Sequence, residues 1–453
     1  MNKLSLTLLT VATLVFTVSA TTLFEDPYTV SGGGDANFEY TIRQSGAAAP
    51  VPYGMANGPF TVTNAGPNAG KLNILAGIGV VSHLNIASHN FTESGDFSVE
   101  VEIDRIDGVD NTHSAQICIG TDGAWLWPEG GNPGLTVRIY QQGHLKVYLN
   151  NGTALINDNF NDLKVSVNQK IKVRIVVSQV DFAGSGDGQI ALFINDKAYP
   201  LQSLGTNMYI LTNPGGFANN YINLQFGEGN VNLDNLKVMT SSGSAITTAL
   251  FTGDADSGVN SAKVYTHSVN LADPADVVIN GQTFTGAGAN QNGSNWEIRT
   301  ANAVPLLGPL PIHEIYGIYP NVTPASRDIL TNVWYSDQNG AGSLTLTGLT
   351  PAQQYILTLY SMAFDVEGGR RSYMATSDGA VITDVDQDEF GQLSGQLMTY
   401  QYTANAEGVF SISTTPITEP WAFYAFSNEE VIPEPAFIGF IILGAAALLK
   451  RKF

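Results

Sequence analysis

The residues best suited to catalysis lie in one short segment, Glu102-Ile-Asp-Arg-Ile-Asp107. In a strand, alternation places Glu102 and Asp104 on the same face. Retaining glycoside hydrolysis needs two carboxyl groups about 5 to 5.5 Å apart. However, the side chain of Asp107 is one methylene shorter than that of glutamate, and Arg105 interrupts an apolar position. We therefore predict that the protein is not an enzyme, and keep a carbohydrate-active enzyme using Glu102 and Asp107 as the alternative.

Other catalytic patterns are missing from the sequence. None of the 6 histidines falls in an HExxH pattern, and no serine falls in GxSxG. Cys118 is the only cysteine, so neither an intrachain disulfide nor a cysteine-based zinc site can form. Its apolar neighbours predict a buried strand residue.

Calcium is the one cofactor that the sequence raises. Asp384, Asp386 and Asp388 have the 1, 3, 5 carboxylate spacing of an EF-hand loop. Glu389 stands where that loop needs glycine, and Gly395 stands where it needs a bidentate glutamate. The pattern excludes a good EF-hand and leaves two interpretations, a looser calcium-stabilised loop or a solvated acidic turn.

A stacking platform for a sugar is the second candidate site. Trp125 and Trp127 alternate before a loop rich in Gly and Pro, which places both rings on one face. Glu129, Asn132 and Arg138 follow closely and are candidates to bind sugar hydroxyls. Packing of these rings into the core is the alternative. Core packing is the prediction for the isolated tryptophans of the second half, Trp296, Trp334 and Trp421.

The elements that position these residues are strands. With 47 glycines and no long amphipathic stripe of helical period, the chain is predicted to be all-β. In FSVEVEIDRI the apolar residues from Phe97 to Ile103 alternate with polar ones. LTVRIY and LKVYLN predict a hairpin with Gly143 in its turn, and IKVRIVV and IALFIN predict a further pair. Such strands with Gly- and Asn-rich turns indicate an antiparallel sandwich or jelly roll over residues 21–240.

These segments, with NFTESGDFSVEVEI and GNVNLDNLKV, resemble the laminin-G and concanavalin A-like jelly rolls of exported bacterial proteins. The resemblance implies a sheet with a concave face, where relatives bind sugars or proteins. The acidic strand also resembles the E-x-D-x-x-E strand of laminarinase-type glycoside hydrolases. That resemblance implies a nucleophile at Glu102 and a general acid at Asp107.

A second β-sandwich is predicted for residues 246–430, after the small polar linker from Ser241 to Ala245. Its segment LTGLTPAQQYILTLY resembles the strand pair of fibronectin-like, malectin-like or galactose-binding-like sandwiches. A hairpin is predicted around Asn405 to Gly408. The expected fold is therefore two tandem antiparallel sandwiches.

Residues 1–20 have the layout of a secretory signal peptide, expected as a helix, with Lys3, an apolar stretch and small residues at the end. Sec-type export machinery and signal peptidase are the expected partners. The formal net charge of −20 argues against nucleic acid as a partner, because phosphate binding needs clustered Lys and Arg.

The C-terminal segment, residues 431–453, carries three signals in order. Pro433, Glu434 and Pro435 precede an apolar stretch, residues 436–449, and a basic cluster of Lys450, Arg451 and Lys452. As a helix that stretch would be about 21 Å long, shorter than the ~30 Å hydrocarbon core. The basic cluster is expected to stay cytoplasmic.

This tail resembles a PEP-CTERM sorting signal. The resemblance implies an exosortase as partner, brief anchoring in the inner membrane, and release to the cell surface or extracellular matrix. A plain membrane anchor is the alternative. The sequence thus predicts an exported surface or matrix protein with a non-catalytic recognition or structural role, and exopolysaccharide is its candidate ligand.

Overall fold

The computed structural model describes, in the first half, the strands between residues 22 and 240. In the second half it describes residues 246–300, 306–312, 319–336, 341–364, 370–378 and 382–432. Every element with described bounds is a strand, apart from two 3-10 turns, η2 (Asp254–Asp256) and η3 (Asp328–Leu330). The fold is therefore all-β with several antiparallel sheets, as the sequence predicts. The signal peptide and the C-terminal apolar stretch lie outside the described residues.

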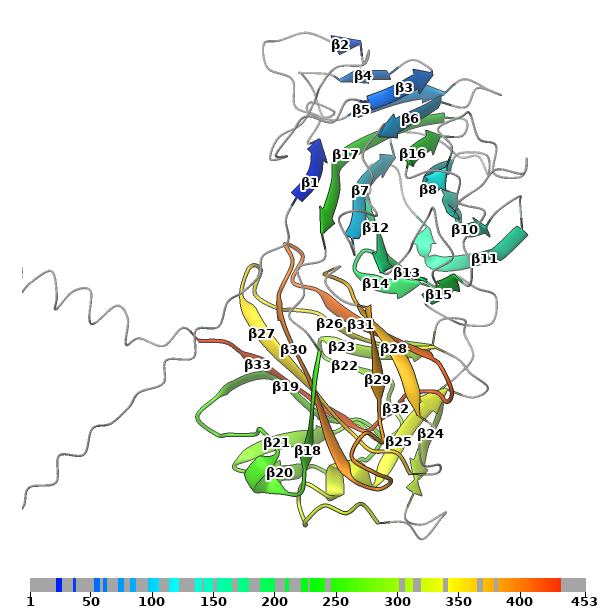
Figure 1. The fold of residues 1–453 in the computed structure, drawn as a ribbon. Helices are drawn as coiled ribbons and strands as arrows, with labels where there is room; N and C mark the ends of the chain where they lie inside the picture. Colours follow the sequence, from blue (N-terminus) through cyan, green and yellow to red (C-terminus); the bar gives the residue numbers. More distant parts are fainter. Residues whose placement is uncertain are drawn as a thin grey trace, which may run out of the picture.

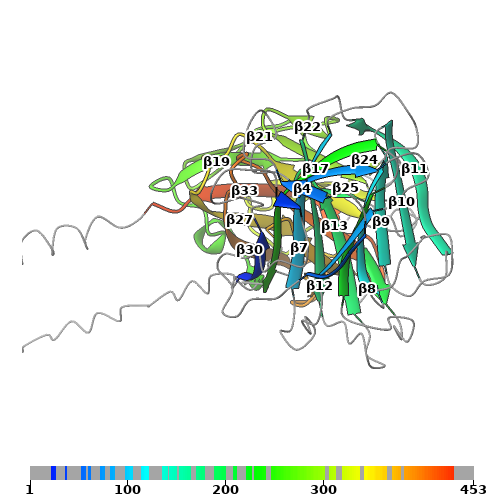
Figure 2. The same cartoon turned by 90° about the horizontal axis from the view of Figure 1, so that it is seen from above.

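The first half forms two sheets, which stand as two layers in Figure 2. The larger has the order β14 (Lys197–Tyr199), β13 (Gly188–Ile194), β12 (Lys170–Ser178), β7 (Phe97–Arg105), β17 (Gly229–Thr240), β5 (Leu72–Ala76), β4 (Phe60–Val62) and β2 (Ala36–Asn37). At its side, β1 (Thr22–Asp26) pairs with β17 and β15 (Met208–Leu211) pairs with β13. The smaller has the order β11 (Thr153–Lys164), β10 (Gln142–Leu149), β9 (Leu135–Tyr140), β8 (Ser114–Thr121), β16 (Tyr221–Phe226), β6 (Ser82–Ile86) and β3 (Tyr53–Asn57).

The second half forms three sheets. The first has the order β18 (Thr247–Phe251), β30 (Gly395–Thr403), β27 (Gln354–Ser361), β33 (Ala425–Glu430), β19 (Val264–Asn270), β21 (Gln282–Gly286) and β20 (Val277–Ile279). The second has the order β22 (Asn292–Gly293), β23 (Trp296–Thr300), β26 (Gly342–Leu346), β31 (Phe410–Pro416), β28 (Arg371–Thr376) and β29 (Ile382–Asp386). The third is β24 (Leu306–Pro311), β25 (Asn332–Ser336) and β32 (Ala422–Phe423).

The local patterns of the first half are confirmed. Phe97, Val99, Val101 and Ile103 are all buried in the core, as their alternation predicts. β9 pairs with β10, and β12 pairs with β13. Gly143 in the first of these turns has φ +86°, a conformation that favours glycine. Cys118 is a buried strand residue, and burial raises the pKa of its thiol to about 12.

The core of the second half is aromatic. Trp296, Trp334 and Trp421 are buried in one cluster with Tyr355, Tyr400, Tyr402 and Phe410, which confirms the core prediction for all three tryptophans. Most of this aromatic surface is removed from water, and burial of a large side chain stabilises a fold by roughly 1.5–3 kcal/mol.

The hairpin predicted around Asn405 to Gly408 is wrong. The turn exists, but β30 pairs with β18 and β27, whereas β31 pairs with β26 and β28 in another sheet. The chain crosses from one layer of the sandwich to the other. The ring of Tyr402 on β30 therefore stacks on Phe410 of β31, with centroids 3.7 Å apart.

The two halves contact each other although no described strand pair joins them. In Figure 1 the β13–β14 hairpin lies against β31 and β28. A small apolar cluster spans the contact and joins Phe193 and Ala198 of the first half to Ala375 of the second. Arg299 of the second half lies over the ring of Tyr199, 5.0 Å from its centroid, and donates to the carbonyl of Ala198. The boundaries at 240 and 246 stay a prediction.

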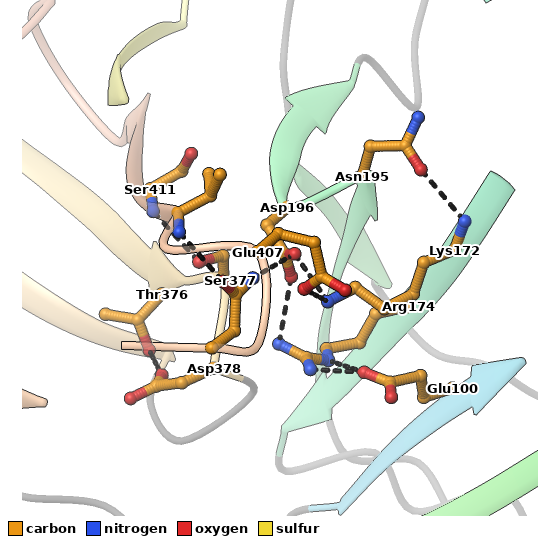
Figure 3. Close-up of polar contacts among 12 residues, drawn as sticks. Glu100, Lys172, Arg174, Asn195, Asp196, Thr376, Ser377, Asp378, Glu407 and Ser411 are labelled. Atoms are coloured by element: carbon orange, nitrogen blue, oxygen red, sulfur yellow. Dashed lines mark hydrogen bonds and ion pairs between the residues drawn. The ribbon is translucent and has the colours of Figure 1, made fainter. Parts of the chain in front are cut away.

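Charged side chains are buried at this contact (Figure 3). Arg174 donates to Glu100 on the neighbouring strand, and its guanidinium lies 3.5 Å from Asp196. Lys172 Nζ is 2.5 Å from Asp196, whose side chain is only 2% exposed. From the second half, Asn405 donates to Asp196, and Glu407 reaches Lys172 at 3.3 Å.

The two carboxyl groups respond differently to the same cations. Burial opposes ionisation of Glu100, but Arg174 and Lys172 outweigh it and lower the pKa of Glu100. Burial dominates at Asp196 and raises the pKa of Asp196 despite the same two cations. Glu100 is one of the polar residues that alternate along β7, yet it is buried: Arg174 lies against it, and Asn405 and Glu407 of the second half contact the same group of charges.

Arg174→Met is expected to lower the free energy of unfolding by about 3 kcal/mol, because it leaves Glu100 and Asp196 buried with a weaker counter-charge. Urea unfolding followed by fluorescence measures it. Lys170→Met is the control: it removes an ion pair with Glu102 in which Lys170 is well exposed, and should cost at most about 1 kcal/mol. Equal losses in the two variants would contradict a buried charge cluster.

Candidate functional site

A pocket of about 340 Å³ opens in the second half, and its walls come from β19, the end of β21 and the β22–β23 hairpin (strands labelled in Figure 1). Its lining carries hydroxyl and amide groups and one indole ring. The residues are Thr266, His267, Ser268, Val269, Thr285, Gly286, Ala287, Asn290, Asn292, Gly293, Ser294 and Trp296. His267 is the one titratable side chain among them, so the pocket is uncharged.

The hairpin wall follows from its local sequence, Asn292-Gly-Ser-Asn-Trp296. Gly293 pairs with Trp296, which leaves Ser294 and Asn295 as a two-residue turn. Asn295 has φ +67°, a left-handed conformation that asparagine tolerates. A Cβ on Gly293 would lie 2.4 Å from the indole nitrogen of Trp296, so only glycine allows this close approach.

His267 joins the strand wall to the hairpin wall. Its Nε2 lies 3.0 Å from the carbonyl oxygen of Asn295, and its Nδ1 lies 2.9 Å from Oγ1 of Thr266. Burial lowers the pKa of His267, with the hydrogen bond to Asn295 opposing the shift. The ring is therefore neutral at physiological pH.

Trp296 supplies the aromatic part of the pocket lining, beside the aliphatic side chains of Val269 and Ala287. It is 8% exposed, belongs to the core cluster and meets Phe426 edge to face, with centroids 6.1 Å apart. Around it the hydroxyls and amides are donors and acceptors of similar strength. The lining offers one titratable group, and both of its ring nitrogens are engaged in hydrogen bonds. Its hydroxyl, amide and indole groups are suited to contacts with a neutral polar molecule.

The predicted stacking site falls mainly outside the described residues, since Trp125, Trp127, Glu129 and Asn132 all lie there. Arg138 is described and buried: its Nε donates to Ser114 Oγ at 2.9 Å, and its guanidinium lies 4.5 Å from the centroid of the Tyr140 ring. Binding of a sugar by this group stays a prediction.

Of the predicted catalytic pair, Asp107 lies outside the described residues. Glu102 is on β7, where Lys170 Nζ lies 2.6 Å from its carboxylate and also 3.2 Å from Asp234. This cross-strand ion pair gives Glu102 a structural role in the sheet.

Of the three predicted calcium ligands, Asp386 and Asp388 are hydrogen-bonded to each other, and Asp384 has another partner. Asp384 forms an ion pair with Arg371, whereas Asp386 Oδ1 accepts the backbone N–H of Asp388 at 3.1 Å. Burial, with a hydrogen bond to Asp388, raises the pKa of Asp386 to about 6. Among the residues whose placement is described, no three carboxylate, histidine or cysteine side chains are grouped to hold a metal. Calcium binding stays a prediction.

The sorting residues Pro433, Glu434, Pro435, Lys450, Arg451 and Lys452 lie outside the described residues. In the part that is described, no helix has the length and apolar character needed to cross a membrane.

Sequence reasoning missed this pocket. It predicted Trp296 as a core residue, which is correct, but it did not connect that residue with His267. The available signal was the segment Asn290-Gln-Asn-Gly-Ser-Asn-Trp296, in which small polar turn residues lead directly into an aromatic ring.

No family model and no curated protein matches the chain. Among solved structures, the ANX1 ectodomain from Arabidopsis thaliana aligns with 84% of this chain and 90% of its own length, with a TM-score of 0.30 and 9% identity. The carbohydrate binding module CBM66 from Bacillus subtilis aligns with 41% of this chain and 94% of its own, with a TM-score of 0.28 and 12% identity. The metal-free Emp46p carbohydrate recognition domain aligns with 37% of this chain and 81% of its own, with a TM-score of 0.28 and 9% identity. Likenesses this low assign neither a family nor a ligand.

Asp386→Asn is expected to raise the melting temperature at neutral pH. Because the pKa of Asp386 is raised to about 6, the folded state holds this proton more tightly than the unfolded state. Ionisation therefore costs stability as pH rises from the ordinary aspartate value towards 6, and the gain from asparagine should vanish below about pH 4. Asp384→Asn is the control, because it removes a carboxylate that is paired with Arg371, whereas Asp386→Asn removes a carboxylate whose ionisation burial disfavours. A gain that does not change between pH 4 and neutral pH would refute this interpretation.

Proposed function

We propose that the protein is an exported, non-catalytic surface or matrix protein that binds an uncharged carbohydrate in the pocket between β19 and the β22–β23 hairpin. The observation that carries this proposal is the lining itself: neutral hydroxyl and amide groups around one indole, with no carboxylate, ammonium or guanidinium group. A volume of about 340 Å³ suits a small portion of a glycan.

The chemistry of a sugar matches this lining. Its hydroxyls need donors and acceptors in about equal number, which Ser, Thr and Asn side chains provide. Its C–H faces need an apolar partner, which Trp296 provides. A net charge of −20 disfavours acidic glycans, because like charges raise the cost of association.

Export rests on the two ends of the sequence. Residues 1–20 have the layout of a signal peptide, and the tail from Pro433 to Lys452 resembles a PEP-CTERM signal. In this proposal an exosortase cuts the chain near Glu434 and passes it from the inner membrane to the cell surface or extracellular matrix, where an exopolysaccharide is the candidate ligand.

Thr285→Trp is expected to reduce binding to an array of neutral hexose and N-acetylhexosamine glycans by at least about tenfold, because a large ring at this exposed lining position fills the pocket. Thr283→Trp is the matched control. Thr283 is also exposed on β21, one alternation earlier, but does not line the pocket. Equal binding by both variants would place the ligand elsewhere, and turnover of any glycan would argue for the enzyme alternative.

The tail is tested separately in an exosortase-containing host. Intact-mass analysis of envelope and culture medium should find mature protein without Lys450, Arg451 and Lys452, and Glu434→Ala should leave uncleaved chain in the inner membrane. Surface-exposed protein that still ends at Phe453 would show an ordinary membrane anchor.

A further inference from the structure

A chain of hydrogen bonds runs from the core of the second half to the pocket, buried at its start and partly buried from Thr266 onward. The hydroxyl of Tyr402 donates to Asn428 Oδ1 at 2.9 Å, and Asn428 Nδ2 donates to Thr266 Oγ1 at 2.8 Å. Thr266 then meets His267, which meets the carbonyl of Asn295. Tyr402 and Asn428 are fully buried, so the start of this chain is rigid.

The acceptors determine the direction of each bond. The carbonyl of Asn295 only accepts, so Nε2 of His267 must carry the hydrogen. In the neutral ring Nδ1 is then an acceptor, and the hydroxyl of Thr266 donates to it at 2.9 Å, with the carbonyl oxygen of Asn428 as a more distant acceptor at 3.3 Å. The amide of Asn428 is oriented by the hydroxyl of Tyr402, which leaves its Nδ2 to donate towards Thr266.

The end of the chain is a wall of the pocket. Asn295 follows Ser294, which lines the pocket, and its carbonyl accepts from His267 and from the backbone N–H of Thr347 at 2.8 Å. Thr266 and His267 belong to β19, which forms the opposite wall. The imidazole therefore links the two walls by the hydrogen bond from its Nε2 to the carbonyl of Asn295, and we call this link the brace.

We infer that His267 is a positioning residue that holds the β22–β23 hairpin at the distance from β19 that the ligand requires, through the hydrogen that its Nε2 donates to the carbonyl of Asn295. This inference deepens the proposed carbohydrate function and rests on it for the identity of the ligand. The brace itself is a property of the fold.

No nearby charge favours protonation of the ring. Thr266 and Ser268 flank it on β19, Phe426 and Asn428 lie on β33, and Asn295 and Trp296 belong to the hairpin. Of the charged groups on these elements, Glu429 pairs with Lys263, Glu297 pairs with Lys197, and Arg299 lies over the ring of Tyr199. Glu430 lies opposite Val264, three residues before His267 on β19. A second proton on the ring would leave the Nε2 bond to Asn295 in place but would bury a charge that no charged group among the described residues offsets.

Substitution separates the two nitrogens. Gln at 267 retains a donor near the position of Nε2, whereas Asn retains an acceptor near the position of Nδ1, and Phe retains only the ring volume. Hydrogen exchange of the 290–296 segment and of the Thr347 amide should become about fivefold faster in His267→Phe and His267→Asn, as expected for one lost hydrogen bond. His267→Gln should exchange like the wild type.

Retention on the neutral glycan array should follow the same order, with wild type and Gln retained and Asn and Phe reduced about fivefold. Circular dichroism and melting of each variant report whether it folds, and the Gln variant keeps the test valid if Phe does not.

The outcomes distinguish this inference from the proposed function. Faster exchange in the Phe and Asn variants supports the brace even if no glycan binds the wild type, in which case only the proposed ligand is wrong. Unchanged exchange in both variants overturns it, including the case in which retention falls, because His267 would then contact the ligand directly.

Discussion

The candidate pocket depends on the hydrogen bond that the buried hydroxyl of Tyr402 donates to Asn428. The ring of Tyr402 packs on Phe410 across the two layers of the sandwich, which fixes where the hydroxyl points. A buried hydroxyl without a partner lowers the free energy of unfolding by about 1–3 kcal/mol, and here Asn428 Oδ1 accepts its hydrogen. The oriented amide of Asn428 then donates to Thr266, and Thr266 in turn is hydrogen-bonded to His267. Packing in the core and the shape of the pocket are thus parts of one arrangement.

The contact between the two halves depends on buried ion pairs, whereas the pocket depends on hydrogen bonds between neutral groups. There, Arg174 and Lys172 are buried with Glu100 and Asp196, and a charge in that position is stable only in one geometry. Asn405, in the turn that crosses between the layers of the second half, donates to Asp196. The same turn therefore closes the aromatic core and holds the β13–β14 hairpin, which ties the orientation of the halves to the packing behind the pocket.

What was predictable from the sequence was set by neighbours close along the chain. Alternation from Phe97 to Ile103 and the apolar context of Cys118 were sufficient, because a strand has only two faces. The turn around Asn405 was also recognised, but the sheet that each flanking strand joins depends on β27 and β26, which are distant in sequence. Burial of Glu100 and the bond from His267 to Asn295 likewise require the assembled fold.

The pocket combines a rigid frame with a neutral surface, and this combination favours recognition over reaction. Catalysis of bond cleavage requires groups that change charge during the reaction, supported by fixed dipoles or charges. Here the only titratable group, His267, is occupied at both nitrogens, and burial keeps it neutral. Charged groups such as Asp196 and Glu102 form ion pairs away from this pocket. The lining offers hydroxyl and amide groups for hydrogen bonds and the small exposed part of one indole ring, and these are the groups that the proposed uncharged carbohydrate would contact.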